Sequence, residues 1–335
     1  MALRCEGAAC ARLYPLVDNI PILINEPNSA FRLEDFVTRK DTTFDYANRN
    51  PWIKRMKKLL PTLYANYDSA ERYSTLARML EKRSGTRRIL VIGGSILGLG
   101  MDALLDVPDV EWVDTDVAFG PRTKLICDAH DLPFADGTFD TAIAQAVLEH
   151  VADPYRCVAE IHRVLKPDGL AYAETPFLWP MHGGVYDFTR FTYMGHRRLF
   201  RFFTEIDSGA SSGPGSTLAL TFWYFLLSLA RTRHSKRAAS FASMMLCGAL
   251  KYLDPWLVRN PSALDVAPGF FFMGYRSERA ISDRTLVEHY RVKAPPRNKA
   301  FVKLPLKRRT LVYAIFLALA IATAATLIRG LRGNL

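Results

Sequence analysis

The stretch of residues 127–176 constrains the fold more than any other part of this 335-residue chain. Residues 138–144, TFDTAIA, form a short apolar run after an Asp-Gly turn, which predicts a buried strand. Residues 151–165 place apolar side chains on one helical face, with Asp153 and Pro154 as cap and first-turn signals, and residues 170–174 return as a second apolar run. Strand, helix and strand in this order predict a parallel crossover in an α/β sheet that is covered on both faces.

Ligands of such sheets bind at the carboxyl ends of the strands. In this sequence those ends fall at residues 145–150 and 175–184. We therefore expect the functional site to be assembled from these two segments.

Four short motifs follow one another in and around this stretch. They are DAHDLPF at 128–134, FD at 139–140, VLEHV at 147–151 and RVLKPDG at 163–169. In order and spacing they resemble the class I S-adenosylmethionine (SAM) dependent methyltransferases, type 11-like, over roughly residues 86–205. The resemblance implies a Rossmann-like α/β fold with a seven-stranded sheet, SAM as the cofactor, and methyl transfer as the reaction.

The segment ILVIGGSILGLG begins as an apolar run and ends in a glycine-rich turn, and we expect the chain to continue from this turn as a helix. By the resemblance, Gly93, Gly94 and Ser95 hold the methionine part of SAM. Two departures stand out: Val91 replaces an acidic residue, and Ser95 replaces the second glycine. As a dinucleotide-binding fingerprint the turn fails at its middle glycine, which disfavours an oxidoreductase.

The strand predicted by VEWVDTD ends in two carboxylates. A carboxylate there can accept both ribose hydroxyls of a nucleoside, although a solvated loop acid is the ordinary alternative. By the resemblance we prefer Asp116 to Asp114 for the ribose. It further implies that Asp128 and Ala129 bind the adenine and that Gln145 lies beside the cofactor.

The segment TPFLWPMHGGVYDFTRFT follows the last parallel strand, where the acceptor should enter. Methyl transfer from a sulfonium has a good leaving group, so positioning contributes most to catalysis. His182 is our first candidate for a general base, Asp187 the second, and His150 a third. The alternatives are structural: Asp187 pairs with Arg190, and His150 bonds backbone groups of its loop.

The region before the first strand has two parts. Residues 1–30 resemble the end of a small zinc-ribbon-like (Trm112-like) module. Cys5 and Cys10 supply only two of the four ligands that a structural zinc site needs, so we predict no metal and a short docked strand or hairpin. Residues 31–85 read as a helical collar or a lid over the cofactor.

Residues 86–283 form the predicted methyltransferase domain, with a helical insertion at 218–258. The insertion holds two apolar pieces separated by a basic break, and each piece is too short to span a bilayer. Its aromatic residues favour an in-plane helical hairpin on a membrane surface. The alternative is a buried helical cap over the substrate cleft.

The C-terminal part carries much of the formal net charge of +11. Residues 284–309 are a basic linker, and residues 310–328 carry no charge and are about long enough to cross a ~30 Å hydrocarbon core. We therefore predict one transmembrane helix that anchors the protein, with the catalytic domain in the cytoplasm because the linker is the more basic flank. A buried C-terminal helix is the alternative. We see no signal peptide.

The five cysteines are odd in number and scattered, which indicates reduced thiols. The basic residues lie in the linker and are not interleaved with aromatics around the cleft, so we expect no nucleic-acid partner. The expected partners are a membrane lipid surface and a lipid-linked or glycan substrate. The sequence leaves the oligomeric state open.

Taken together, these features predict SAM-dependent methyl transfer to a lipid-linked, glycan or amphipathic acceptor at the cytoplasmic membrane face. The first alternative is a catalytically inactive scaffold at the membrane that keeps the SAM fold, suggested by Val91 and Ser95 in the cofactor loop. A second alternative is a methyltransferase acting on a quinone or a small lipid.

Overall fold

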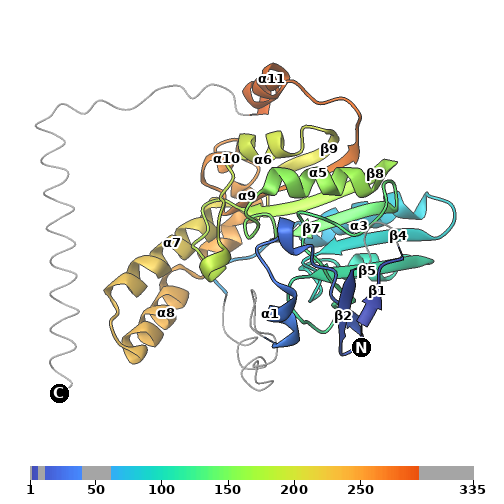
Figure 1. The fold of residues 1–335 in the computed structure, drawn as a ribbon. Helices are drawn as coiled ribbons and strands as arrows, with labels where there is room; N and C mark the ends of the chain where they lie inside the picture. The colour runs from blue at the N-terminus through green and yellow to red at the C-terminus, as the bar shows by residue number, and fades with distance from the viewer. Residues whose placement is uncertain (1, 7–11, 40–61, 294–335) are drawn as a thin grey trace, which may run out of the picture. The chain divides into compact units, whose positions relative to one another are not determined.

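A computed structural model of the protein describes residues 2–6, 12–39 and 62–293 (Figure 1). Its centre is a seven-stranded sheet in the order β6-β5-β4-β7-β8-β10-β9. Strand β10 runs antiparallel to both its neighbours, and the remaining pairs are parallel. The strands are β4 (Arg87–Ile92), β5 (Val110–Asp116), β6 (Leu125–Ile126), β7 (Phe139–Gln145), β8 (Leu165–Pro176), β9 (Phe203–Ala210) and β10 (Gly269–Arg276). The predicted seven-stranded, Rossmann-like sheet is confirmed.

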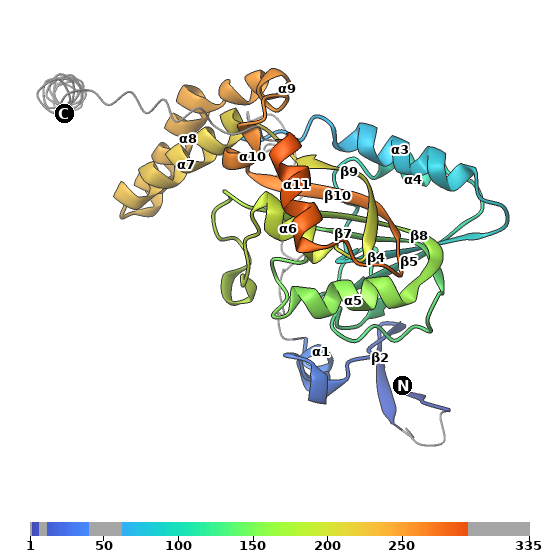
Figure 2. The same ribbon diagram turned by 90° about the horizontal axis from the view of Figure 1, so that it is seen from above.

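Alternate residues of the central strands pack against helices on opposite faces of the sheet. Leu90 and Ile92 of β4 belong to the apolar cluster that includes α5 (Pro154–Val164). Ile89 and Val91 belong to a second cluster with α3 (Ser69–Glu81) and α4 (Asp102–Leu105). Figure 2 shows α3 and α5 on the two sides of the sheet. Both faces are therefore covered, which is why these strands are almost continuously apolar.

The strand-helix-strand unit has the caps that its sequence predicts. Asp153 accepts a hydrogen bond from the Arg156 backbone N–H at 3.1 Å, and Pro154 occupies the first turn of α5. Strand β8 begins earlier than predicted, at Leu165. Part of the reason is an ion pair between Lys166 Nζ and Asp140 at 2.8 Å, which holds this segment beside β7.

The glycine-rich turn after β4 differs from the expectation of a helix. Only the four residues of α4 are helical, and they begin well after Gly94. The turn instead packs on the start of α3, where Ser69 Oγ donates to the Leu99 carbonyl at 2.6 Å. Gly100 has a φ of 84° and a Cβ there would lie 2.7 Å from Ser69 Oγ, so glycine is needed at this contact.

The predicted insertion is a helical region between β9 and β10. Its main elements are α7 (Pro214–Leu229) and α8 (Arg233–Cys247), which form a hairpin that Figure 1 shows extending from the sheet. Buried Asp254 anchors the base of the hairpin, because it accepts hydrogen bonds from the backbone N–H groups of Gly215 and Ser216 at 2.7 and 3.0 Å. The insertion continues with η3 (Leu250–Leu253), α9 (Asp254–Leu257) and α10 (Ala263–Val266).

The N-terminal segment docks on the edge of the main sheet, as predicted for a short strand or hairpin. It forms a three-stranded antiparallel sheet of β1 (Ala2–Arg4), β2 (Leu13–Val17) and β3 (Ile20–Pro21). The Leu23 N–H donates to the Ile126 carbonyl of β6 at 2.8 Å. The chain continues through η1 (Glu26–Asn28) and α1 (Leu33–Val37).

The membrane prediction requires correction. Among residues 2–6, 12–39 and 62–293, no helix combines the length and apolar character that a bilayer crossing requires. The longest apolar helix, α7, has 16 residues and spans only about 24 Å. The predicted span at 310–328 and the end of the basic linker lie outside the described residues. The prediction is corrected accordingly: localisation by a C-terminal single-pass anchor is not supported by any described helix.

Three further helices lie outside the elements described above. The short helix η2 (Gly184–Tyr186) lies within the acceptor-side loop, and α6 (Tyr193–Leu199) follows that loop. Helix α11 (Asp283–Lys293) follows β10. His196 of α6 is buried against the rings of Phe191 and Phe200. Burial, reinforced by the neighbouring charge of Arg197, lowers the pKa of His196 to about 3.

We predict that His196 makes stability fall in acid. The unfolded chain binds this proton near pH 6.5, whereas the folded chain does not, so stability is lost as the pH falls from about 6.5 toward the folded pKa. At pH 5 the cost is about 2 kcal/mol. Urea unfolding of His196→Leu at pH 8 and pH 5 should show a loss of stability smaller by this amount than in the wild type. An equal loss in both proteins, or the same effect in the His162→Leu control, would contradict it.

Candidate functional site

A cavity of about 480 Å³ opens at the carboxyl ends of β4, β5, β7 and β8. This is the position at which open α/β sheets bind ligands, and the volume is in the range of small-molecule sites. Of the predicted cofactor residues, Gly93, Asp116, Asp128, Ala129 and Gln145 line the cavity. The two segments expected to build the site do meet there.

The glycine turn after β4 forms one wall, and its close contacts require glycine. Gly93 has a φ of 70°, and a Cβ there would lie 2.4 Å from Val147 Cγ2. A Cβ on Gly98 would lie 2.0 Å from Gln145 Oε1. The absence of side chains at these points keeps the wall open, so that backbone can approach a ligand closely.

Gly94 and Ser95 do not line the cavity, although the sequence predicted both as cofactor residues. The Gly94 N–H donates to the Thr115 carbonyl at 2.8 Å. Ser95 is fully buried, and its N–H donates to Asp116 Oδ2 at 3.1 Å. The departure from glycine at Ser95 therefore lies behind the wall, where the residue positions the carboxylate.

Asp116 and Asp114 lie on the same strand but face different surroundings. Asp116 lines the cavity, and its Oδ1 accepts from the N–H groups of Val117 and Ala118 at 2.7 and 3.0 Å. Burial raises the pKa of Asp116. Asp114 instead pairs with Arg122, at 3.1 Å between Nη2 and Oδ2, and does not line the cavity.

Asp128 is held at the far end of this wall by its neighbours. Its Oδ1 accepts from the His130 N–H at 3.0 Å and contacts His130 Nδ1 at 2.6 Å, while Ser29 Oγ donates to Oδ2. Burial opposes ionisation, but the hydrogen bonds from His130 hold the pKa of Asp128 below its usual value. Two cavity-lining carboxylates, Asp116 and Asp128, therefore fit the hydroxyl and amino groups of a nucleoside, as SAM requires.

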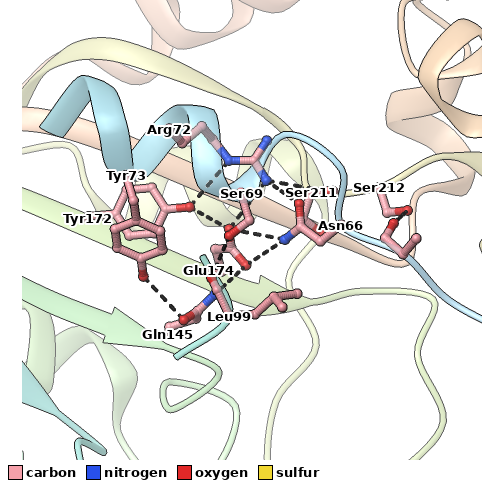
Figure 3. A network of polar contacts seen from close by, with 11 residues as sticks. Asn66, Ser69, Arg72, Tyr73, Leu99, Gln145, Tyr172, Glu174, Ser211 and Ser212 are labelled. Atoms are coloured by element: carbon pink, nitrogen blue, oxygen red, sulfur yellow. Dashed lines mark hydrogen bonds and ion pairs between the residues drawn. The ribbon is translucent and has the colours of Figure 1, made fainter. Parts of the chain in front are cut away.

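A buried polar network holds these walls together (Figure 3). At its centre is Glu174 at the end of β8, which accepts from Gln145 Nε2 at 3.2 Å, from Asn66 Nδ2 at 3.1 Å and from the Tyr172 hydroxyl. Arg72 of α3 pairs with Glu174 at 3.4 Å. Gln145 Nε2 also donates to the Leu99 carbonyl at 3.2 Å, so the network fixes the glycine turn as well.

On the acceptor side, two loops bring together Glu149, His150 and His182. Both histidine Nε2 atoms lie 3.7 Å from Glu149 Oε1, and the two rings are edge to face with centroids 4.8 Å apart. The Glu149 side chain is fully buried. Interaction with this negatively charged carboxylate raises the pKa of His182 despite partial burial. Ala146, with a φ of 55°, makes the strained turn that leads from β7 into this cluster.

The remaining catalytic candidate, Asp187, does not line the cavity. It forms an ion pair with Arg190, and its Oδ2 accepts from the backbone N–H groups of His182 and Gly183 at 2.7 and 3.1 Å. Although burial opposes it, the hydrogen bond from Arg190 lowers the pKa of Asp187 well below its usual value. The structure thus places Asp187 where it shapes the His182 loop. The catalytic roles of His182, Asp187 and His150 stay predictions.

Aromatic side chains that the sequence reasoning missed line the acceptor side. Tyr64 and Trp179 meet edge to face at 4.7 Å, and Phe31 lies 5.3 Å from Tyr186. All four line the cavity. The proximity of Trp179 to His182 in the sequence was a usable signal, whereas Tyr64 comes from a loop more than 80 residues before the first of the catalytic candidates. Asn66, Arg72 and Glu174 were also missed.

Comparison with known proteins agrees with this geometry. Residues 110–173 match the sequence profile of a family described as "Methyltransferase domain". The chain is 39% identical over 96 residues to a ubiquinone/menaquinone biosynthesis C-methyltransferase of Desulfotalea psychrophila, covering 28% of this chain and 38% of that protein. It is 43% identical over 127 residues to an uncharacterized methyltransferase of Mycobacterium sp. strain JLS, covering 35% and 50%. The chain thus spans half or less of the length of these relatives.

A solved structure of Haemonchus contortus phosphoethanolamine N-methyltransferase 2 in complex with S-adenosyl-L-methionine is 14% identical, with a TM-score of 0.37. It covers 62% of this chain and 53% of that chain. At that TM-score the likeness supports no inference about this chain. The family match begins at residue 110 and lends no support to the predicted Trm112-like remnant at residues 1–30. Residues 110–173 are thus similar to a methyltransferase domain, and the cofactor is S-adenosyl-L-methionine.

Proposed function

We propose that the protein transfers the methyl group of SAM to an amphipathic acceptor. One observation carries the proposal: a single cavity has Gly93, Asp116 and Asp128 on one wall and Glu149 with His182 on another. A cofactor held by the first wall would present its sulfonium toward the second. The cavity would thereby hold both reactants in one desolvated space, which is the main contribution that an enzyme makes to this displacement.

The acceptor side favours a molecule that is apolar at one end and polar at the other. Tyr64, Trp179 and Phe188 supply aromatic surface, and Glu149 with the two histidines supplies the polar groups. Lipid-linked or glycan-bearing acceptors have this character. A quinone ring is a second candidate, because Trp179 offers a stacking surface and one relative is named as a quinone biosynthesis C-methyltransferase.

A scaffold that binds SAM without turnover is the competing function. It was suggested by Val91 and Ser95 in the cofactor turn. Ser95 lies behind the cavity wall, and Val91 lines the cavity beside Gly93. Because residue 91 is apolar, the carboxylates on that wall of the cavity are those of Asp116 and Asp128. The scaffold and the enzyme therefore make the same prediction for SAM binding and differ only in product formation.

The first prediction concerns the cofactor. Asp116→Asn should weaken binding of SAM and S-adenosylhomocysteine by roughly 10- to 100-fold, because one charged acceptor of the ribose hydroxyls is lost. Isothermal titration with S-adenosylhomocysteine measures the change. Asp114→Asn removes a carboxylate of the same strand that faces Arg122, and it should leave the affinity unchanged. Equal weakening in both variants would show that the loss is structural and would contradict the assignment.

The second prediction concerns the acceptor. Incubation with methyl-labelled SAM and a total lipid extract should give S-adenosylhomocysteine and a labelled lipid-soluble product. Trp179→Ala should raise KM for that acceptor at least about tenfold, since it removes the largest aromatic contact, while the affinity for S-adenosylhomocysteine stays the same. Tight SAM binding with no labelled product from lipid or aqueous extracts would favour the scaffold.

A further inference from the structure

The cluster of Glu149, His150 and His182 has a geometry that the proposed methyl transfer does not itself require. One ligand atom from each residue lies within 4.8 Å of the other two. Each histidine Nε2 is 3.7 Å from Glu149 Oε1, which is too long for a hydrogen bond. Two atoms about 2.1 Å from one metal ion, at angles of about 110–125°, would lie about 3.4–3.7 Å apart. The two separations from Glu149 are those of ligands around a shared ion. The largest separation in the cluster, up to 4.8 Å, exceeds the ~4.2 Å that two such ligands can span, so the histidines would move slightly closer together around the ion.

The other ring nitrogen of each histidine fixes the tautomer. His150 Nδ1 lies 2.9 Å from the Tyr186 carbonyl oxygen, and His182 Nδ1 lies 3.2 Å from the Pro180 carbonyl oxygen. A carbonyl can only accept, so each Nδ1 carries a hydrogen. In a neutral ring, Nε2 then carries the lone pair, and it faces Glu149. Metal-binding histidines are oriented in the same way, with the second nitrogen donating to a backbone carbonyl.

The carboxylate at the centre of the cluster is otherwise unsatisfied. Glu149 is fully buried, and neither of its oxygens has a hydrogen-bond partner among the residues that the structure describes. A buried, ionised carboxylate without a partner costs several kcal/mol. When both rings are neutral, two nitrogen lone pairs directed at the carboxylate add repulsion. A cation between the three atoms removes both costs at once.

We propose that Glu149, His150 and His182 bind a divalent transition-metal ion of the Zn²⁺ class. Two imidazoles and one carboxylate are a ligand set of catalytic zinc sites, which keep a fourth position open. The nitrogen ligands disfavour Mg²⁺ and Ca²⁺, which prefer oxygen. All three residues line the cavity, so the open position faces the space assigned to the acceptor.

This inference rests on the proposed function and narrows it to an acceptor with a hydroxyl group. Binding of the hydroxyl oxygen to the ion lowers its pKa, and the proton leaves to solvent. The oxygen then attacks the methyl carbon of SAM. The carbon–sulfur bond breaks, its electron pair stays on sulfur, and the products are a methyl ether and S-adenosylhomocysteine. Glu149 keeps the charge of the site balanced while the ion orients the acceptor.

The test measures metal and cofactor separately on the full-length protein. Chelator-treated protein is dialysed against ZnCl2 and its metal content is determined, and a second sample is titrated with Co²⁺ and followed by visible absorption. We expect about one ion per chain and the spectrum of a four- or five-coordinate Co²⁺ site. Glu149→Gln and His182→Ala should each weaken binding at least about tenfold. His162→Ala, a histidine remote from the cavity, is the matched control.

The outcomes separate this proposal from the proposed function. Metal content that is unchanged in both Glu149→Gln and His182→Ala would place the ion elsewhere and overturn the proposal. Absence of Zn²⁺ and Co²⁺ binding would also overturn it, leaving a proton shared by Glu149 and His182 as the occupant. Binding of S-adenosylhomocysteine to the same samples tests the methyltransferase independently. Glu149→Gln keeps the side-chain volume, so it remains informative if His182→Ala fails to fold.

A second inference comes from the surface of the α7–α8 hairpin. Large apolar side chains are exposed along both helices: Leu218, Phe225 and Leu229 on α7, and Phe241, Met245 and Leu246 on α8. On α7 the spacing of seven and four residues puts the three side chains on one face, and on α8 Phe241 and Met245 are four residues apart. Two further aromatic side chains are exposed in the segment after α8: Tyr252, and Trp256, which is 75% exposed. A monomeric soluble protein rarely leaves so many apolar side chains together in water.

The charge around this surface is of one sign. Arg231, Arg233, Lys236 and Arg237 are exposed at the turn between the helices and the start of α8. No acidic residue occurs in the sequence from 208 to 253. Trp223 Nε1 donates to Ser240 Oγ at 2.9 Å and ties the two helices into one unit.

From the combination of exposed apolar side chains and neighbouring cations, we infer that the hairpin lies in the surface of an anionic lipid layer without crossing it. Apolar and aromatic side chains beside a cluster of cations are what interfacial helices present to lipid headgroups. A second copy of the chain would meet the same cations and be repelled.

Vesicle co-sedimentation of the full-length protein tests this inference. Binding should be stronger to phosphatidylcholine vesicles that contain phosphatidylglycerol than to phosphatidylcholine alone, and salt should weaken it. Replacing Arg233 and Arg237 with Gln should lower the partition coefficient roughly fivefold per charge. Arg284→Gln on exposed α11 is the control. The remainder of the chain is identical in all variants, so differences report the hairpin.

The apolar part is tested by Phe225→Ser with Leu246→Ser, which should lower binding to anionic vesicles at least about tenfold. Unchanged partition in this variant would overturn the inference. So would a concentration-dependent dimer, in place of lipid binding, that is lost in the same variant.

Discussion

The site depends on the hydrogen bonds and the ion pair made by the buried carboxylate of Glu174. It lies at the end of β8 and is bonded by groups from three other segments: Asn66 before α3, Arg72 within α3, and Gln145 at the end of β7. Breaking a buried pair of this kind leaves an uncompensated charge and costs about 3–5 kcal/mol. Since Gln145 also holds the Leu99 carbonyl, the position of the cofactor turn relative to β7 and β8 follows from this one network.

The acceptor side is held by an equivalent link between its two loops. The N–H groups of Phe188 and Thr189 donate to the Glu149 carbonyl at 2.8 and 3.2 Å, so hydrogen bonds hold the loop after β8 against the loop after β7. Asp187 and Arg190 then close the second loop on itself. These bonds place His182 opposite Glu149. The cluster that we propose as a metal centre is thus set by backbone geometry and does not need the ion to form.

The sequence was sufficient for features that are local. Asp153 and Pro154 predicted the start of α5, and the segments VEWVDTD and TFDTAIA predicted β5 and β7 to within one residue. It was insufficient where contacts join distant segments. The Asn66–Glu174 hydrogen bond joins residues 108 positions apart in the sequence. The cluster of Glu149, His150 and His182 brings two distant histidines to one carboxylate, and no sequence pattern predicts that this carboxylate is buried. The family resemblance also assigned Gly94 and Ser95 to the cofactor, and neither lines the cavity, because sequence spacing does not tell which side of a turn faces the ligand.

The hairpin and the cavity are connected through a short segment, and this gives the apolar surface a relation to the chemistry. Ser211 lines the cavity, and the next residue, Ser212, donates to the Ala65 carbonyl at 2.5 Å. Two residues later α7 begins, with its first N–H groups held by buried Asp254. A hairpin resting on a lipid surface would therefore bring that surface close to one wall of the cavity. An acceptor with an apolar tail could keep the tail in the lipid while its polar end reaches Glu149. Such an acceptor would account for both the exposed apolar hairpin and a cavity that carries aromatic side chains on one side and charged groups at its end.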